Sequence, residues 1–187
     1  MITTSGGGAL ICRTTEDANE IMWYATQARD AYPYYEHTAI GYNYRMSNVC
    51  AGIGRGQMTV LDDHIAHHKH IHDLYEKAFR DIDGITLLTN PDERFNSNYW
   101  LCNILIDPDK TGFNYEDLRL ALEEANVESR PLWKPMHLQP VFADCDSYLN
   151  GVSESLFNKG LCLPAGPWVS DEDIALIVDT IKSMIKR

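Results

Sequence analysis

Apolar side chains after Ser47 return every three or four residues over a long stretch of the chain. They are Val49, Ile53, Val60, Leu61, Ile65, Ile71, Leu74, Ala78 and Phe79. This spacing marks one face of an α-helix, so the pattern predicts a single long helix that begins near Ser47. Three glycines, Gly52, Gly54 and Gly56, lie in its first half. Each costs about 1 kcal/mol relative to alanine, which indicates close packing against another backbone.

The segment before this helix has a different pattern. Two β-prone runs, residues 2–4 and 9–13, flank a Ser-Gly-Gly-Gly sequence. A glycine turn between two such runs predicts a β-hairpin. Thr14 or Thr15 is then expected to cap a helix over residues 16–29.

After Gly84 the pattern changes to short alternating elements. Strands are predicted over residues 85–88, 100–106, 127–130 and 160–163, and helices over 114–125 and 174–185. Ser170 is the expected cap of the last helix, with Asp173 at the capping-box position. A domain boundary near Gly84 therefore separates residues 1–84 from a small α/β domain over 85–187.

Composition and charge narrow the functional classes. The chain is 44% hydrophobic and 23% charged, as expected of a folded protein. Its net charge of −11 argues against a nucleic-acid partner, because phosphate backbones select basic surfaces. The five cysteines form no CxxC pair, which indicates reduced thiols in a cytoplasmic protein rather than disulfides or a zinc ribbon. No apolar run approaches the length of a membrane span, and the first residues do not resemble a signal peptide.

A histidine cluster within the long predicted helix is a candidate metal site. It comprises His64, His67, His68, His70 and His72. Two i,i+4 pairs have the spacing at which imidazoles share a metal, but no glutamate completes a HExxH motif. The apolar stripe through Ile65 and Ile71 leaves most of these rings on other faces. A solvated helix face is therefore expected, and metal binding is the minor alternative. The glycine clusters match no complete dinucleotide-binding motif.

The loop over residues 128–140 is a candidate binding surface. It combines two cations, a tryptophan, a histidine and a glutamine with three prolines. Rigid loops that carry such side chains often bind ligands. An ordered crossover loop whose tryptophan fills the core is an equally weighted alternative.

Several segments together resemble the DegT/StrS family of sugar aminotransferases. They are TTSGGG at 3–8, ATQAR at 25–29, GYNYRM at 41–46, RPLWKPMHLQP at 130–140 and LPAGP at 163–167. The match runs the length of the chain, and GYNYRM is its most specific piece. The RPLWKPMHLQP segment is similar to the branch that acts on UDP-4-keto-6-deoxy-HexNAc sugars.

The resemblance implies the C-terminal part of a fold type I aminotransferase, an α/β protein that works as a homodimer with pyridoxal 5'-phosphate. Residues 1–84 would be the end of the cofactor-binding large domain, with a glycine hairpin, the GYNYR loop and a long connecting helix. Residues 85–187 would be the small domain. The implied reaction is amination of a UDP-linked 4-keto sugar, with glutamate as the usual amino donor.

The family's Schiff-base lysine would immediately precede the position of Met1. Lys69, Lys77 and Lys134 do not match that position, so the chain is expected to be truncated and inactive alone. The rival interpretation is a non-catalytic binding or dimerisation module, or one half of a split enzyme.

The resemblance also assigns expected site residues. Asn43 of the GYNYR loop would bind the cofactor phosphate, reaching into the partner subunit's site. The nucleotide-sugar site would be lined or bordered by Arg45, Trp133, Lys134, His137 and Gln139. No catalytic residue within the chain and no metal ligand are expected.

Overall fold

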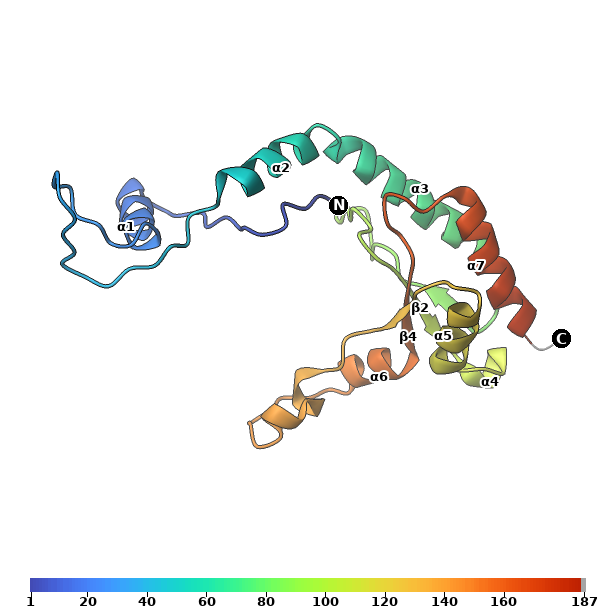
Figure 1. Cartoon of the computed structure of the whole chain (residues 1–187). Coiled ribbons are helices and arrows are strands. Elements are labelled where there is room, and N and C mark those ends of the chain that lie inside the picture. The colour runs from blue at the N-terminus through green and yellow to red at the C-terminus, as the bar shows by residue number, and fades with distance from the viewer. Residues whose placement is uncertain (186–187) are drawn as a thin grey trace. The chain divides into compact units, whose positions relative to one another are not determined.

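The computed structural model describes residues 1–185 of the 187-residue chain and divides into two compact units (Figure 1). The first unit is Ile2–Leu61. The second begins at Asp62 and also includes Met1. The domain boundary near Gly84 stays a prediction, and that position lies in the second unit, directly before its first strand.

The first unit contains two helices, α1 (Thr15–Ala25) and α2 (Asn48–Met58). The Thr14 hydroxyl accepts a hydrogen bond from the Asp17 N–H at 3.1 Å, which confirms Thr14 as the cap of α1. The helix ends earlier than predicted, because Gln27 and Ala28 adopt positive φ angles of 70° and 48°. That left-handed conformation cannot continue an α-helix.

The predicted glycine hairpin is wrong, because residues 2–13 form no strand. The Thr3 N–H donates instead to the side-chain carbonyl of Gln57 at 3.0 Å. Leu10 and Ile11 are 70% and 93% exposed, so the second run has no buried face. An isolated two-stranded hairpin is marginally stable without such a face.

The predicted single long helix is also wrong, because it is divided after α2. The next helix, α3, is Leu61–Phe79. Between them the N–H groups of Thr59 and Val60 donate to the carbonyls of Gly56 and Gln57, at 3.2 and 3.3 Å. The Thr59 hydroxyl also donates to the Gly56 carbonyl at 2.7 Å. A side chain that bonds to the local backbone competes with helix formation, and glycine weakens the helix further.

The second unit is built on a four-stranded antiparallel sheet with the strand order β1-β2-β4-β3. The strands are β1 (Ile85–Leu87), β2 (Cys102–Ile106), β3 (Arg130–Pro131) and β4 (Gly160–Leu163). In the central pair, Cys102 lies opposite Leu163 and Ile104 opposite Leu161. All four strands occur where the sequence predicts strands, although β3 covers only the end of its predicted run and one residue beyond.

The core lies where this sheet meets α3, α5 (Tyr115–Glu124) and α7 (Asp171–Met184). Alternate residues of β2 are buried in this core, and each of the three helices contributes the side chains of one face to it. The largest fully buried apolar side chains are Ile71, Tyr75, Ile104, Ile106, Leu118, Leu122, Leu161, Ile177 and Ile181. Each such aliphatic side chain contributes about 1.5–3 kcal/mol of transfer free energy, so this cluster is the main source of stability for the unit.

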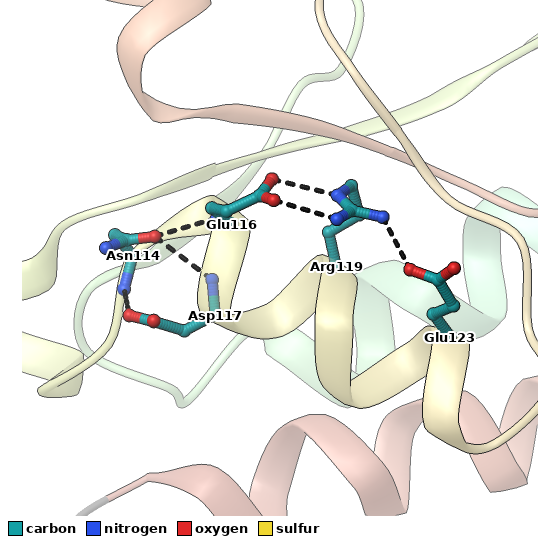
Figure 2. Close-up of polar contacts among 5 residues, drawn as sticks. All are labelled: Asn114, Glu116, Asp117, Arg119 and Glu123. Carbon is teal, nitrogen blue, oxygen red and sulfur yellow. Dashed lines mark hydrogen bonds and ion pairs between the residues drawn. The ribbon is translucent and has the colours of Figure 1, made fainter.

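Capping boxes fix the starts of α5 and α7. In α5 the Asn114 side chain accepts from the Glu116 and Asp117 N–H groups at 2.8 and 3.1 Å, and the Asp117 carboxylate accepts from the Asn114 N–H (Figure 2). Ser170 and Asp173 form the same reciprocal pair at α7, which confirms the predicted cap. Such caps contribute about 0.5–2 kcal/mol each.

Arg119 adds a second surface network on α5. Its guanidinium donates to Glu116 one turn before it and to Glu123 one turn after it, with distances of 2.8 Å (Figure 2). These are the i,i+3 and i,i+4 spacings at which helical side chains meet.

Two helices have no counterpart in the sequence analysis, α4 (Pro108–Thr111) and α6 (Val152–Lys159). Two short 3-10 turns are also present: η1 (Met136–Leu138) lies within the loop over residues 128–140, and η2 (Pro140–Phe142) begins at its last residue. Helix α6 begins after Gly151 with no side-chain cap, so the usual start signal is missing from the sequence.

Candidate functional site

A pocket of about 520 Å³ opens at the β3–β4 edge of the second unit. Its walls come from α3, from the residues just before β2, from β3 and the loop on either side of it, and from β4 with the loop that follows. The lining residues are Met1, His68, Trp100, Leu101, Glu128, Ser129, Arg130, Pro131, Trp133, Cys162, Leu163, Pro164, Ala165, Gly166 and Pro167.

A hydrogen bond from a side chain of α3 holds the loop after β4 in place. The buried Tyr75 hydroxyl donates to the Pro164 carbonyl at 2.9 Å. Burial raises the pKa of Tyr75, so the phenol remains a donor. Leu163 and Ala165 are also buried, at 2% and 5% exposed. This wall of the pocket is therefore an extension of the hydrophobic core.

A strained residue, Tyr99, directly precedes Trp100 of the pocket. Tyr99 has a φ angle of 47°, a left-handed conformation that is unusual for a bulky side chain. Its ring stacks on the buried His72, with centroids 3.6 Å apart, and its N–H donates to the Ser97 hydroxyl. The next residue, Trp100, lines the pocket and is 59% exposed. Such strain costs about 1–3 kcal/mol and is common at functional sites.

The only charged side chains that line the pocket, among the residues described, are Glu128 and Arg130. The Arg130 guanidinium donates to the Glu128 carboxylate at 2.8 and 2.5 Å, and both side chains are largely exposed. Burial raises the pKa of the neighbouring Cys162 thiol, and the charge of Arg130 opposes that change. Cys162 therefore remains a neutral thiol at neutral pH.

His68 is the most buried polar residue of the pocket, at 1% exposed. Burial is the largest cause that lowers its pKa, and positive charge at the Met1 amino group, His67 and His64 acts in the same direction. A hydrogen-bonding interaction with the Tyr99 backbone, the smallest of the causes, raises the pKa of His68. The ring is therefore neutral at neutral pH.

The structure places the four expected site residues of the second unit in different surroundings. Trp133 lines the pocket and is 67% exposed. Lys134 is exposed, and its carbonyl accepts from the Gln139 amide at 3.4 Å. The Nε2 of His137 lies 3.7 Å from a carboxylate oxygen of Glu154 in α6. His137 also lines a separate pocket together with Phe142. Trp133 is thus the one of the four that shares the pocket with Arg130.

Asn43 and Arg45 belong to the first unit, and both side chains are exposed. Their loop is held by backbone hydrogen bonds to the end of α1, including an isolated β-bridge between Thr26 and Asn43. The rings of Tyr42 and Tyr44 stack beside it, 5.2 Å apart. The loop therefore presents the Asn43 amide on a fixed backbone.

The expectation of a solvated histidine face is wrong for two of the five histidines. His68 and His72 are 1% and 3% exposed, because the face of α3 that carries them packs inward with Ile71 and Tyr75. Within residues 1–185, no group of three or more His, Cys, Asp or Glu side chains is arranged to hold a metal ion.

His68 and Trp100 line the pocket but were not predicted as site residues from the sequence. A helical repeat shows which residues share a face, but it does not show which of several mixed faces will be buried. Trp100 has no motif around it.

Comparison with known proteins identifies the family. Residues 1–182 match the model of the DegT/DnrJ/EryC1/StrS aminotransferase family. The chain belongs to this family. EpsN of Bacillus subtilis (strain 168), whose name assigns it to the pyridoxal phosphate-dependent aminotransferases, is 35% identical over 186 residues, covering 97% of this chain and 47% of EpsN. GDP-perosamine synthase of Escherichia coli O157:H7 is 30% identical over 96% of this chain and 48% of the enzyme.

Solved structures of other proteins share the fold. PseC of Helicobacter pylori, an aminotransferase of pseudoaminic acid biosynthesis, matches with a TM-score of 0.85 at 17% identity, over 98% of this chain and 50% of PseC. DesI, solved with its TDP-sugar product, matches with a TM-score of 0.82 at 22% identity, over 97% of this chain and 46% of DesI. The chain thus spans about half the length of these relatives, and the expected fold, part of a fold type I aminotransferase, is confirmed.

Proposed function

We propose that this chain works in a pyridoxal phosphate-dependent aminotransferase that moves an amino group from glutamate to the 4-keto carbon of a UDP-linked sugar. The family match over residues 1–182 carries this proposal. Relatives are named for GDP- and dTDP-linked sugars, so family membership alone leaves the nucleotide open. The choice of UDP rests on the RPLWKPMHLQP segment at 130–140.

The first unit offers a suitable group for the cofactor phosphate. An amide N–H donates to a phosphate oxygen without adding charge, and the Asn43 side chain is exposed on a backbone held by the Thr26 bridge. We assign Asn43 to the cofactor phosphate of a partner subunit's site. Pyridoxal phosphate, when bound, supplies the electron sink for amino transfer.

The amine that would attach the cofactor covalently is a lysine side chain. No lysine lines the pocket among the residues that the structure describes. We therefore propose that this chain contributes binding residues, and that the lysine needed for covalent attachment of the cofactor comes from outside these 187 residues. On this view the chain alone does not catalyse amino transfer. The same observation supports the second candidate, one half of a split enzyme.

Arg45, Trp133, Lys134, His137 and Gln139 are proposed to line or border the nucleotide-sugar site. Cationic and amide side chains suit a diphosphate and a uracil, and an indole suits a ring face. Trp133 has the strongest support of the five, because it already lines a pocket with Arg130.

We also propose that the chain forms a homodimer in the cytoplasm. In the first unit Ala28 is the only buried hydrophobic residue, whereas Ile11, Ile40, Tyr44 and Val49 are each more than 70% exposed. Apolar surface of this kind is usually covered by another chain. All five cysteines are free, as in a reducing compartment. Within the described residues, no helix has the length and apolar character that crossing a membrane requires.

A direct test of the function joins this chain in frame to the N-terminal half of EpsN. The joined protein is supplied with pyridoxal phosphate, glutamate and a UDP-4-keto-6-deoxy-N-acetylhexosamine. We expect an aminated UDP-sugar by mass spectrometry. A joined protein that binds the cofactor and turns yellow, yet aminates GDP- or dTDP-linked sugars and not the UDP-linked one, would contradict the assignment of UDP.

The same joined protein tests the role of Asn43. Asn43→Ala should weaken cofactor binding about 10- to 150-fold, the effect of losing one hydrogen bond to a charged group, about 1.5–3 kcal/mol. The matched control is Asn19→Ala, a change of an exposed asparagine on α1 of the same unit. Equal cofactor affinity for both variants and the parent protein would refute the assignment.

A further inference from the structure

Asn150 is the one asparagine of the chain that is followed by glycine. A backbone nitrogen can attack the side-chain carbonyl of the asparagine before it, and the attack is easiest when that nitrogen belongs to glycine, because glycine has no Cβ to obstruct the approach. Every other asparagine precedes a residue with a side chain, of which Ser97, after Asn96, has the smallest. The sequence therefore contains a single pair of this reactive type.

The structure leaves the nitrogen of Gly151 accessible. Asn150 and Gly151 are both exposed and lie directly before α6. A Cβ at Gly151 would meet nothing within 4 Å, so the space beside this residue is open. Within the described residues the Gly151 N–H donates no hydrogen bond. No other contact of the backbone therefore competes with its reaction.

The side chain of Asn150 is turned toward that nitrogen. Its Oδ1 accepts a hydrogen bond from the Val152 N–H at 3.1 Å. An asparagine that bonds to the backbone two residues ahead folds its carboxamide over the peptide in between, which here is the peptide whose nitrogen belongs to Gly151. The same Val152 N–H can stabilise the negative charge that develops on Oδ1 when its carbon is attacked.

Two comparable positions in the chain are restrained instead. The Asn96 Oδ1 accepts from the Lys69 ammonium at 2.8 Å, which ties that carboxamide to α3. Asp83 precedes Gly84, and its carboxylate accepts from the Lys110 ammonium at 2.8 Å. This hydrogen bond lowers the pKa of Asp83, and an ionised carboxylate resists nucleophilic attack. These two positions are internal controls.

We propose that Asn150 is a site of spontaneous deamidation. The Gly151 nitrogen forms a bond to Cγ of Asn150, the bond from Cγ to Nδ2 breaks, and ammonia leaves with the proton of the Gly151 N–H. Water then opens the cyclic imide at either carbonyl, which leaves an aspartyl or an isoaspartyl residue at position 150. No atom changes its oxidation state, and either product adds one negative charge at neutral pH.

The isoaspartyl product changes the start of α6. Its main chain runs through the former side chain, so the hydrogen bond from the Val152 N–H to Oδ1 is lost. Gly151 supplies no side-chain cap that could replace it. Helix α6 carries Glu154, whose carboxylate lies 3.7 Å from the Nε2 of His137. Deamidation therefore affects the surroundings of a residue proposed for the nucleotide-sugar site, although Asn150 is not part of that site.

The test compares the folded 187-residue chain with the same chain unfolded in urea, both incubated at mildly alkaline pH. Peptide mass spectrometry follows each asparagine, and a protein isoaspartyl methyltransferase with S-adenosylmethionine labels isoaspartyl residues. In the folded chain we expect Asn150 to convert at least about tenfold faster than Asn96, a barrier difference of about 1.4 kcal/mol. No isoaspartyl label is expected at Asp83. Gly151→Ala should slow the conversion about tenfold or more in both states, because the new Cβ obstructs the attack.

Three results would overturn the assignment. Equal rates at Asn150 and Asn96 in the folded chain would show that the structure selects no site. A rate at Asn150 more than about tenfold lower in the folded than in the unfolded chain would show that the turn protects this residue. An unchanged rate in Gly151→Ala, measured in urea where both chains are unfolded, would exclude attack by the following nitrogen.

Discussion

Replacing Gly160 with alanine tests how tightly Leu132, the residue after β3, packs against β4. Gly160 opens β4 with φ −97° and ψ 141°, a conformation that alanine adopts without strain. An added Cβ would lie 2.7 Å from the Leu156 carbonyl oxygen, and still closer to two side-chain carbons of Leu132. The cost is therefore steric. Overpacking of this kind costs about 1–3 kcal/mol.

The assay is thermal and urea unfolding of the whole chain. For a chain of this size each kcal/mol lowers Tm by about 2–4 °C, so Gly160→Ala should lower Tm by about 2–12 °C. Gly52→Ala is the matched control, because its Cβ would meet nothing within 4 Å and it lies inside helix α2. That control should be neutral or stabilising by up to about 1 kcal/mol.

A double variant identifies which contact causes the loss of stability in Gly160→Ala. Leu132→Ala removes the side-chain carbons nearest to the new Cβ. The combined variant should be more stable than the sum of the single changes predicts, by at least about 0.5 kcal/mol. Unchanged stability of Gly160→Ala, or strict additivity with Leu132→Ala, would refute the close packing of Leu132 on β4.

Three further predictions concern stability, each measured by urea unfolding. Tyr75→Phe leaves the Pro164 carbonyl without its donor and should cost about 1–3 kcal/mol; no change would mean that solvent replaces this bond. Asn114→Ala removes the cap of α5 and should cost about 0.5–2 kcal/mol, whereas Asn19→Ala, at an exposed position inside α1, should cost less. The lowered pKa of His68 means that the unfolded chain binds a proton below pH about 6.5 that the folded chain does not. Stability should therefore fall as the pH drops below that value, by up to about 1.4 kcal/mol per pH unit. His68→Asn should show a smaller decrease between pH 7 and pH 5, and an identical decrease would be evidence against a buried neutral ring.

Elements with local signals were predictable from the sequence. Helix α7 begins at its predicted cap because Ser170 and Asp173 bond to nearby backbone, which requires no tertiary contact. Strand β2 follows from the alternation of apolar residues at Cys102, Ile104 and Ile106. The glycine hairpin failed because turn preference alone does not provide a second buried face.

The candidate site was only partly predictable, because it is assembled from distant segments. The composition of the loop over residues 128–140 indicated that Trp133 could be a site residue. The pairing of Arg130 with Cys162, which brings this loop to β4, spans residues far apart in sequence. The burial of His68 depends on which face of α3 meets the sheet, and five histidines on one helix do not reveal that face. The burial of an imidazole ring is recognisable only in three dimensions.

The most direct test of a chain that binds substrate but lacks the reactive amine is chemical trapping. The purified 187-residue chain is incubated with pyridoxal phosphate and reduced with borohydride, and the adducts are mapped by mass spectrometry. Surface lysines form unshielded imines, so we expect scattered adducts below one per chain, and no glutamate-dependent amination of a UDP-4-keto sugar. A covalent cofactor link needs an amine of lowered pKa held at the site. A single stoichiometric adduct at one lysine, together with glutamate-dependent amination by the chain alone, would contradict this account.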